Sequence, residues 1–211
     1  MTLPTPSARR AYWLKTLHQW HWISSALCLL GMLLFAVTGL TLNNAGLIEA
    51  KARVASRHAQ LPEALRADLA RRAGERDGER AALPGAAAQW LAAELGVDAG
   101  GRQAEWSTGG IYLSLPRPGG DAWLAMDLAT GEVEHEVTDR GWIAYLNDLH
   151  KGRNTGRAWS WFLDLFAVAC LVFSLTGLLL LKMHAGRRAA TWPMVGLGAL
   201  VPLLLALLFI H

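Results

Sequence analysis

Three long apolar runs separate the polar parts of this chain. They extend over residues 22–42, 159–181 and 192–210, and the only charged residue within them is Asp164. A helix needs about 20 predominantly apolar residues to cross roughly 30 Å of hydrocarbon. We therefore predict three transmembrane helices. The first run is longer than the roughly 7–15 apolar residues of a signal peptide, so we interpret it as an uncleaved membrane anchor.

The segment between the first two runs has the pattern of a small folded domain. Residues 62–75 and 82–96 have helical patterns, and Gly96 is a candidate helix C-cap. The pattern then changes to alternation in residues 110–116, 121–128 and 132–137, with turn signals at 117–120 and 129–131. Helices followed by short antiparallel strands predict a compact α+β unit.

Composition and charge place this pattern in a membrane. The chain is 53% hydrophobic with a mean hydropathy of +0.23, which is too apolar for an ordinary soluble domain of this length. Basic residues without acids occupy the N-terminal arm and the link between the second and third runs, and such residues mark the cytoplasmic side. We therefore predict a cytoplasmic N-terminus, with residues 43–158 and the C-terminus on the other side. The net charge of +3 reflects this asymmetry and does not indicate nucleic-acid binding. The basic residues are Arg9, Arg10, Lys15, Lys182, Arg187 and Arg188.

A short repeat links the first two apolar runs. FAVTGLTL at 35–42 resembles FSLTGLLL at 173–180, and the predicted topology makes the two copies cross the membrane in opposite directions. Gly39 and Gly177 would let helices approach closely, and Thr38 and Thr176 would hydrogen-bond between helices. Ordinary helix packing is the simpler interpretation of this repeat.

Five of the seven histidines lie at the predicted membrane edges. His18, His21 and His184 fall at the cytoplasmic edge, and His150 and His211 fall at the opposite edge. Imidazoles from separate helices suit the axial positions of a haem iron, which takes one or two protein ligands. Interfacial histidines beside tryptophans, another metal and a proton relay remain alternatives. The other two histidines, His58 and His135, are expected to be ordinary solvated side chains.

Three sequence segments resemble the PepSY-associated transmembrane (PepSY-TM) family. LHQWHWISSALCLLGMLLFAVTGL at 17–40 resembles its first helix, and LHKG at 149–152 with the following apolar run resembles a later helix. AWLAMDLATGEVEHE at 122–136 resembles the PepSY strand motif with its Asp-x-x-Thr-Gly turn. The resemblance implies a bacterial inner-membrane location, a periplasmic PepSY-like domain, and haem-b reductase activity toward ferric siderophores or related acceptors.

The family resemblance supports some of the histidines as haem ligands more directly than others. His18 matches the histidine of the family's first helix and His150 matches the later Leu-His motif. His21 departs from the usual pattern, and His184 and His211 are candidates through topology alone. A haem b on the cytoplasmic side would use His18 or His21 with His184, and one on the periplasmic side would use His150, perhaps with His211. One or two haems per chain, or haems shared across a dimer, are compatible with this set.

We thus expect an α-helical membrane protein with an inserted α+β PepSY-like periplasmic domain. Its parts would be residues 1–42 (arm and first span), 43–148 (periplasmic domain), 149–184 (amphipathic segment and second span) and 185–211 (link and third span). Gly152, Asn154 and Gly156 should break the helix between His150 and the second span, since one straight helix would be too long. Larger family members have more than three spans, so we expect a homodimer.

The expected function is electron transfer from a separate donor molecule to a periplasmic acceptor such as a ferric chelate. The chain has no Gly-rich dinucleotide fingerprint, so the donor is expected to be another molecule. Two alternatives remain: a non-redox, membrane-anchored regulatory or binding protein, and a metal or proton permease.

Overall fold

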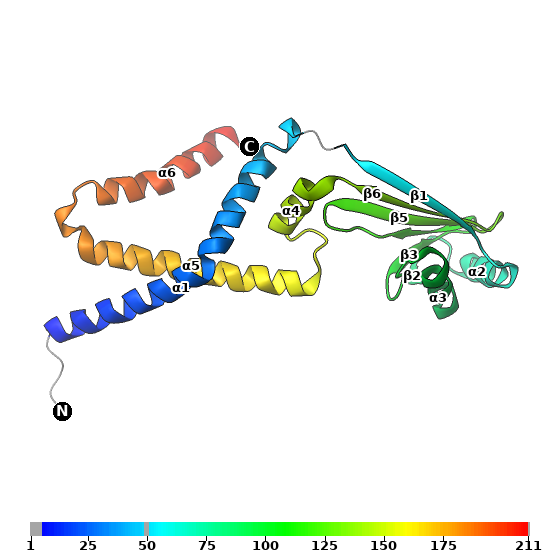
Figure 1. Cartoon of the computed structure of the whole chain (residues 1–211), viewed down its shortest axis with the longest axis horizontal. Helices are drawn as coiled ribbons and strands as arrows, with labels where there is room; N and C mark the ends of the chain where they lie inside the picture. The colour runs from blue at the N-terminus through cyan, green and yellow to red at the C-terminus, as the bar shows by residue number, and fades with distance from the viewer. Residues whose placement is uncertain (1–5, 49–50, 211) are drawn as a thin grey trace, which may run out of the picture. The chain divides into compact units, whose positions relative to one another are not determined.

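The computed structural model describes residues 6–48 and 51–210, and the chain divides into two compact units. Residues up to Leu34 and from Trp161 onward form the first unit, and Phe35–Ser160 forms the second. Figure 1 shows the elements of both units along the chain.

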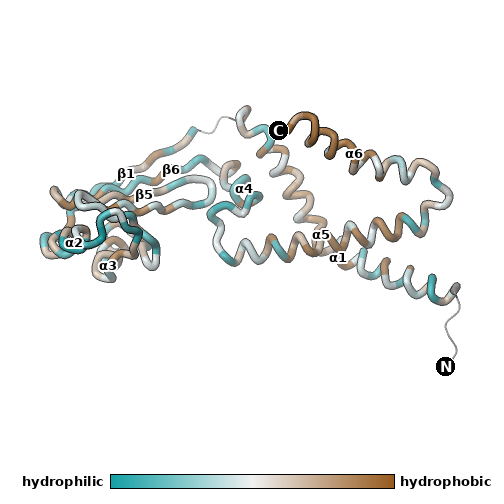
Figure 2. Tube along the Cα trace, turned by 180° about the vertical axis from the view of Figure 1, so that it is seen from behind, coloured by the Kyte–Doolittle hydropathy of each residue, from teal (hydrophilic) through white to brown (hydrophobic). Residues whose placement is uncertain are grey.

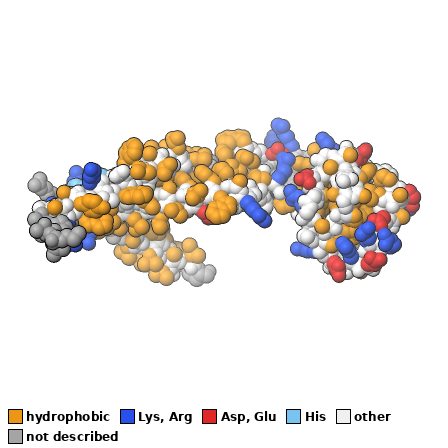
Figure 3. Space-filling view, turned by 90° about the horizontal axis from the view of Figure 1, so that it is seen from below, with side chains coloured by type: hydrophobic (Ala, Val, Ile, Leu, Met, Phe, Trp, Pro, Cys, Tyr) orange, Lys and Arg blue, Asp and Glu red, His pale blue; other side chains and the backbone are white. Residues whose placement is uncertain are grey.

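The first unit contains the greater part of three helices long and apolar enough to cross a membrane, and the adjoining ends of the first two belong to the second unit. The three helices are α1 (Pro6–Asn43), α5 (Gly156–His184) and α6 (Thr191–Phe209). Helix α6 is the most uniformly apolar (Figure 2), and apolar side chains cover the helices in the space-filling view (Figure 3). The three predicted spans are therefore present as helices. Helix α1 begins well before the predicted span, because the polar arm is itself helical.

Helices α1 and α5 pack antiparallel within this unit. Gly31 provides the closest approach, since a Cβ there would lie 2.3 Å from Cε2 of Phe166. The thiols of Cys28 on α1 and Cys170 on α5 adjoin one another about one turn away, and neither forms a disulfide. These small residues let the helices approach closely.

The second unit contains a six-stranded antiparallel sheet of order β1-β6-β5-β4-β3-β2. The strands predicted from alternation are β4 (Gly110–Ser114), β5 (Gly120–Asp127) and β6 (Glu132–Asp139). Sequence analysis missed β1 (Arg53–Gln60), β2 (Arg80–Ala82) and β3 (Gln103–Trp106). Strand β1 pairs along its whole length with β6 yet is almost entirely exposed, so it lacks the buried alternate positions that reveal a strand.

Two helices supply the rest of the domain core. They are α2 (Glu63–Glu75) and α3 (Gly85–Leu95), and both were predicted, including the left-handed Gly96 that ends α3. Leu69 and Leu91 from the helices pack with Trp106, Leu113 and Leu124 from the sheet. The α+β domain is therefore confirmed.

Helix α4 (Gly141–Lys151) follows the sheet and carries His150. It ends in a left-handed Gly152, and Asn154 and Gly156 also have positive φ before α5 begins. The predicted helix break is confirmed. The backbone N–H of Gly119 donates to Oδ2 of Asp148 (2.9 Å), which ties α4 to the turn between β4 and β5.

Candidate functional site

Three histidines gather where α1 packs on the last turns of α5, and we call His18, His21 and His184 the α1–α5 histidine cluster. The imidazole of His21 stacks on the ring of Phe173, with centroids 4.7 Å apart and planes 14° apart. Its Nδ1 lies 3.0 Å from Oγ1 of Thr176 and 3.2 Å from the backbone carbonyl of Phe173.

These partners determine which nitrogen of His21 carries the proton. A carbonyl oxygen can only accept a hydrogen bond, and the hydroxyl of Thr176 donates its own hydrogen to Val172 O (2.7 Å). The oxygens around Nδ1 therefore act as acceptors, so Nδ1 of His21 carries the hydrogen. The Nε2 atom is left with a free lone pair.

His18 and His184 are fixed in the same tautomer by their own helices. Nδ1 of His18 lies 2.8 Å from Leu14 O, and Nδ1 of His184 lies 2.8 Å from Leu180 O. Both acceptors are carbonyls four residues earlier, so both imidazoles donate from Nδ1 and keep Nε2 unprotonated. The two rings are exposed and nearly perpendicular (88°), with centroids 5.8 Å apart. The structure thus brings together His18 and His184, one of the two predicted pairs.

His150 lies in a separate site in the second unit, between α4 and the last turns of α1. Its Nδ1 is 2.7 Å from Oγ1 of Thr38, and its ring centroid is 4.9 Å from that of Phe35. Thr38 is 4% exposed, and its hydroxyl donates to Phe35 O (3.3 Å). With its hydrogen directed to Phe35 O, the hydroxyl oxygen of Thr38 can accept from Nδ1–H of His150.

Further hydrogen bonds hold α4 in this position. Oγ1 of Thr41 donates to Oδ1 of Asn147 (2.8 Å), and Asn147 is 8% exposed. The indole of Trp159 donates to Leu149 O (2.9 Å). His150 therefore projects from a helix that is fixed on either side of it.

The remaining histidines join neither site. His58 is exposed and pairs with Glu132 (3.2 Å), as expected for a solvated side chain. His135 is half-buried in the sheet, and its Nδ1 has no hydrogen-bond partner in the described part of the chain, so the solvated interpretation is wrong for it. His211 lies outside the described residues, so its predicted role stays a prediction.

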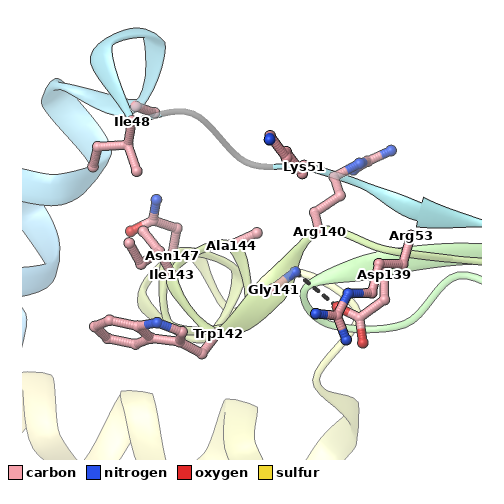
Figure 4. Close-up of a pocket in the computed structure, with 11 residues that line it drawn as sticks. Ile48, Lys51, Arg53, Asp139, Arg140, Gly141, Trp142, Ile143, Ala144 and Asn147 are labelled. Atoms are coloured by element: carbon pink, nitrogen blue, oxygen red, sulfur yellow. Dashed lines mark hydrogen bonds between the residues drawn. The ribbon is translucent and has the colours of Figure 1, made fainter.

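A pocket of about 490 Å³ lies beside α4 within the second unit (Figure 4). Trp142 and Ile143 provide apolar surface from α4, and Ile48 provides it from the chain after α1. Cationic side chains lie along its other side. Asp139 is the only carboxylate of the lining. Its carboxylate accepts from Gly141 N (2.7 Å) and forms an ion pair with Arg117 (3.3 Å). The cations of the lining therefore exceed its anionic charge; they are Lys51, Arg53 and Arg140.

Sequence reasoning found the histidines but missed what surrounds them. The Phe-x-x-Thr-Gly repeat was noticed as a helix-packing signal, whereas both threonines hydrogen-bond to imidazoles. The pocket was not anticipated, because its residues come from two segments that lie far apart in the sequence, 45–53 and 139–147. The sequence did contain a signal for an anionic ligand, because basic residues flank the two connections between the helices and the sheet. They are Lys51, Arg53 and Arg140.

The fold and these sites define a membrane-type helical protein that carries an antiparallel sheet domain between its first two long apolar helices. The model of the family described as "Putative PepSY_TM-like" matches residues 12–211. The chain belongs to this family, which confirms the family resemblance. Searches of the curated proteins and of the solved structures found no match.

Proposed function

We propose that this chain is a haem-b protein of the bacterial inner membrane that passes electrons to a periplasmic ferric chelate. One observation carries the proposal: four imidazoles, His18, His21, His150 and His184, each place Nδ1 within hydrogen-bond distance of an oxygen. With Nδ1 as the donor, Nε2 of the neutral imidazole is the nitrogen that would bind a metal. A metal-binding histidine typically has this arrangement, in which an outer hydrogen bond fixes the tautomer and raises the basicity of the ligating nitrogen.

The donor set favours a porphyrin over a bare ion. No group of three or more His, Cys, Asp or Glu side chains that could hold a metal ion occurs within residues 6–48 and 51–210. Haem iron needs only one or two protein ligands. His18 or His21 with His184 would supply such a pair, and the ring centroids of His18 and His184 are 5.8 Å apart.

When bound, haem would supply one-electron redox chemistry, and the chain would supply ligands, orientation and an acceptor site. The α1–α5 histidine cluster would hold a haem toward the cytoplasmic side, where a separate donor molecule delivers electrons. His150 would hold a haem toward the periplasmic side. The homodimer expected from the sequence stays a prediction.

The pocket beside α4 is the proposed acceptor site. Its excess of cationic side chains favours an anionic ligand such as a ferric chelate, and its apolar wall favours the organic part of that ligand. Asn147 lines this pocket and lies one helical turn before His150 on α4. The acceptor would thus be bound close to the periplasmic haem ligand.

The absorption spectrum of the full chain, purified in detergent with haem supplied during expression, tests the proposal. We expect a Soret band and a reducible α band, with haem content lowered by His18→Ala, His184→Ala or His150→Ala. His58→Ala is the matched control, since His58 is an exposed histidine of the sheet domain. A folded but colourless protein would refute the proposal and favour the non-redox regulatory or binding function.

A further inference from the structure

The Phe-x-x-Thr-Gly repeat forms the same local structure twice. In each copy, a histidine from another helix packs against the phenylalanine, the threonine and the glycine of the motif. In α5, Phe173, Thr176 and Gly177 surround His21; in α1, Phe35, Thr38 and Gly39 surround His150.

The contacts agree in detail. The Oγ1–Nδ1 distances are 3.0 Å at Thr176 and 2.7 Å at Thr38. The distances between phenylalanine and imidazole centroids are 4.7 Å and 4.9 Å. A Cβ on Gly177 would lie 3.1 Å from Cε1 of His21, and one on Gly39 would lie 3.6 Å from Cε1 of His150. Gly177 therefore leaves room for the imidazole edge, whereas a Cβ on Gly39 would make an ordinary van der Waals contact with it.

Both threonines are buried, at 8% exposure for Thr176 and 4% for Thr38. Each hydroxyl lies within hydrogen-bond distance of a carbonyl of its own helix, to which it can donate while its oxygen accepts from the imidazole. Water does not readily replace such a buried contact, and a buried donor without a partner is costly. Plain helix packing would not require a hydroxyl at this position.

We propose that Phe-x-x-Thr-Gly is a histidine-holding motif used once per site, in which Thr176 and Thr38 are positioning residues. Each threonine fixes its histidine as the Nδ1–H tautomer, so that Nε2 of His21 and of His150 can bind a haem iron. The inference rests on the proposed haem function, and it singles out His21 within the α1–α5 histidine cluster.

A hydrogen bond from Nδ1–H makes an imidazole a stronger donor to iron, which favours the ferric state. Thr38→Val should therefore raise the midpoint potential of the haem bound by His150, and Thr176→Val should raise that of the haem bound by His21. The second effect should be smaller, because His21 keeps the carbonyl of Phe173 as an acceptor. Thr38→Ser and Thr176→Ser should restore the wild-type potentials.

A spectroscopic redox titration of the full-length holoprotein in detergent measures these potentials. Ser24→Ala is the matched control, since the buried Ser24 hydroxyl of α1 donates to the backbone carbonyls of Trp20 and His21 and to no imidazole. The inference predicts that Ser24→Ala leaves both potentials unchanged. Unchanged potentials in Thr38→Val and Thr176→Val, or shifts that serine does not reverse, would overturn it while leaving the haem function standing.

A second measurement does not depend on haem. Nitrogen-15 NMR of histidine-labelled, haem-free full-length protein distinguishes the two tautomers. His21 and His150 should show the Nδ1–H form. Thr38→Val should shift His150 toward a mixture, and Thr176→Val should shift His21 less, because its Nδ1 keeps the carbonyl of Phe173. If the wild-type protein binds no haem, the proposed function fails. If the wild-type histidines already show a mixture, the motif does not select the tautomer and the inference fails.

Discussion

The hydrogen bond between Thr41 and Asn147 should control how tightly α4 is held against α1. Thr41→Val removes the hydroxyl donor, so Oδ1 of the buried Asn147 loses this hydrogen bond. Loss of one partner of a buried hydrogen bond costs about 1–3 kcal/mol. The Thr41 hydroxyl also lies 2.9 Å from Thr38 O, and this competing acceptor places the expected cost near the lower end, at about 1–2 kcal/mol.

Such a cost corresponds to roughly a 5- to 30-fold larger population of the state in which α4 is detached. Hydrogen exchange of the full chain in detergent, followed by mass spectrometry, measures it through the amides of residues 141–151. These amides should exchange faster by about that factor, while those of α2 in the sheet domain stay unchanged. The double variant Thr41→Val/Asn147→Leu should lose much less protection than the sum of its single variants. Unchanged α4 exchange in Thr41→Val, or equal acceleration in α2, would refute the reasoning.

Three further predictions concern packing and pH. Gly31→Leu should lower the thermal unfolding temperature of the full chain, because its Cβ would lie 2.3 Å from the Phe166 ring. Adding Phe166→Ala to this variant should restore part of the loss. An unchanged unfolding temperature in Gly31→Leu would contradict the packing of α1 on α5. Burial, and secondarily Arg57, lowers the pKa of His135 below its usual 6.5, so folding favours the neutral imidazole. The sheet domain should therefore be most stable above pH 6.5 and lose stability as the pH falls through the lowered pKa, and His135→Leu should flatten this decline in thermal melts. Hydrogen bonds from Thr130 and Ala129 lower the pKa of Asp127 below its usual 3.8. Its contribution to the stability of the sheet domain is therefore present above pH 3.8 and is lost as the pH falls through the lowered pKa. Asp127→Ala should lower the thermal unfolding temperature at pH 7, and equal unfolding temperatures in the wild type and the variant would exclude this role for the turn.

The apolar helices and three of the strands could be predicted because their patterns depend on burial alone. Trp22–Leu42 has no charge, and alternate residues of β5 are buried, so both elements are visible in the sequence. Strand β1 was invisible because its pairing with β6 is made by backbone atoms and its side chains stay exposed. The early start of α1 was missed because helix propensity in a polar arm does not produce an apolar pattern.

The candidate site could be predicted only in its residue types. Histidines at the membrane edges were visible, but the contacts of His21 and His150 are made by residues far away in the sequence. Thr176 lies 155 positions from His21 and Thr38 lies 112 positions from His150. The repeat hinted that both threonines had one shared role, and only the structure identified imidazoles as their partners.

Haem content per chain, compared between the wild type and its histidine variants, tests the central claim most directly. The full chain, expressed with haem supplied and assayed as the pyridine haemochromogen, should contain haem b. His18→Ala, His184→Ala and His150→Ala should each lose a part of it, and His58→Ala should lose none. Wild-type protein that folds without haem, or haem that all three variants keep in full, would contradict the account.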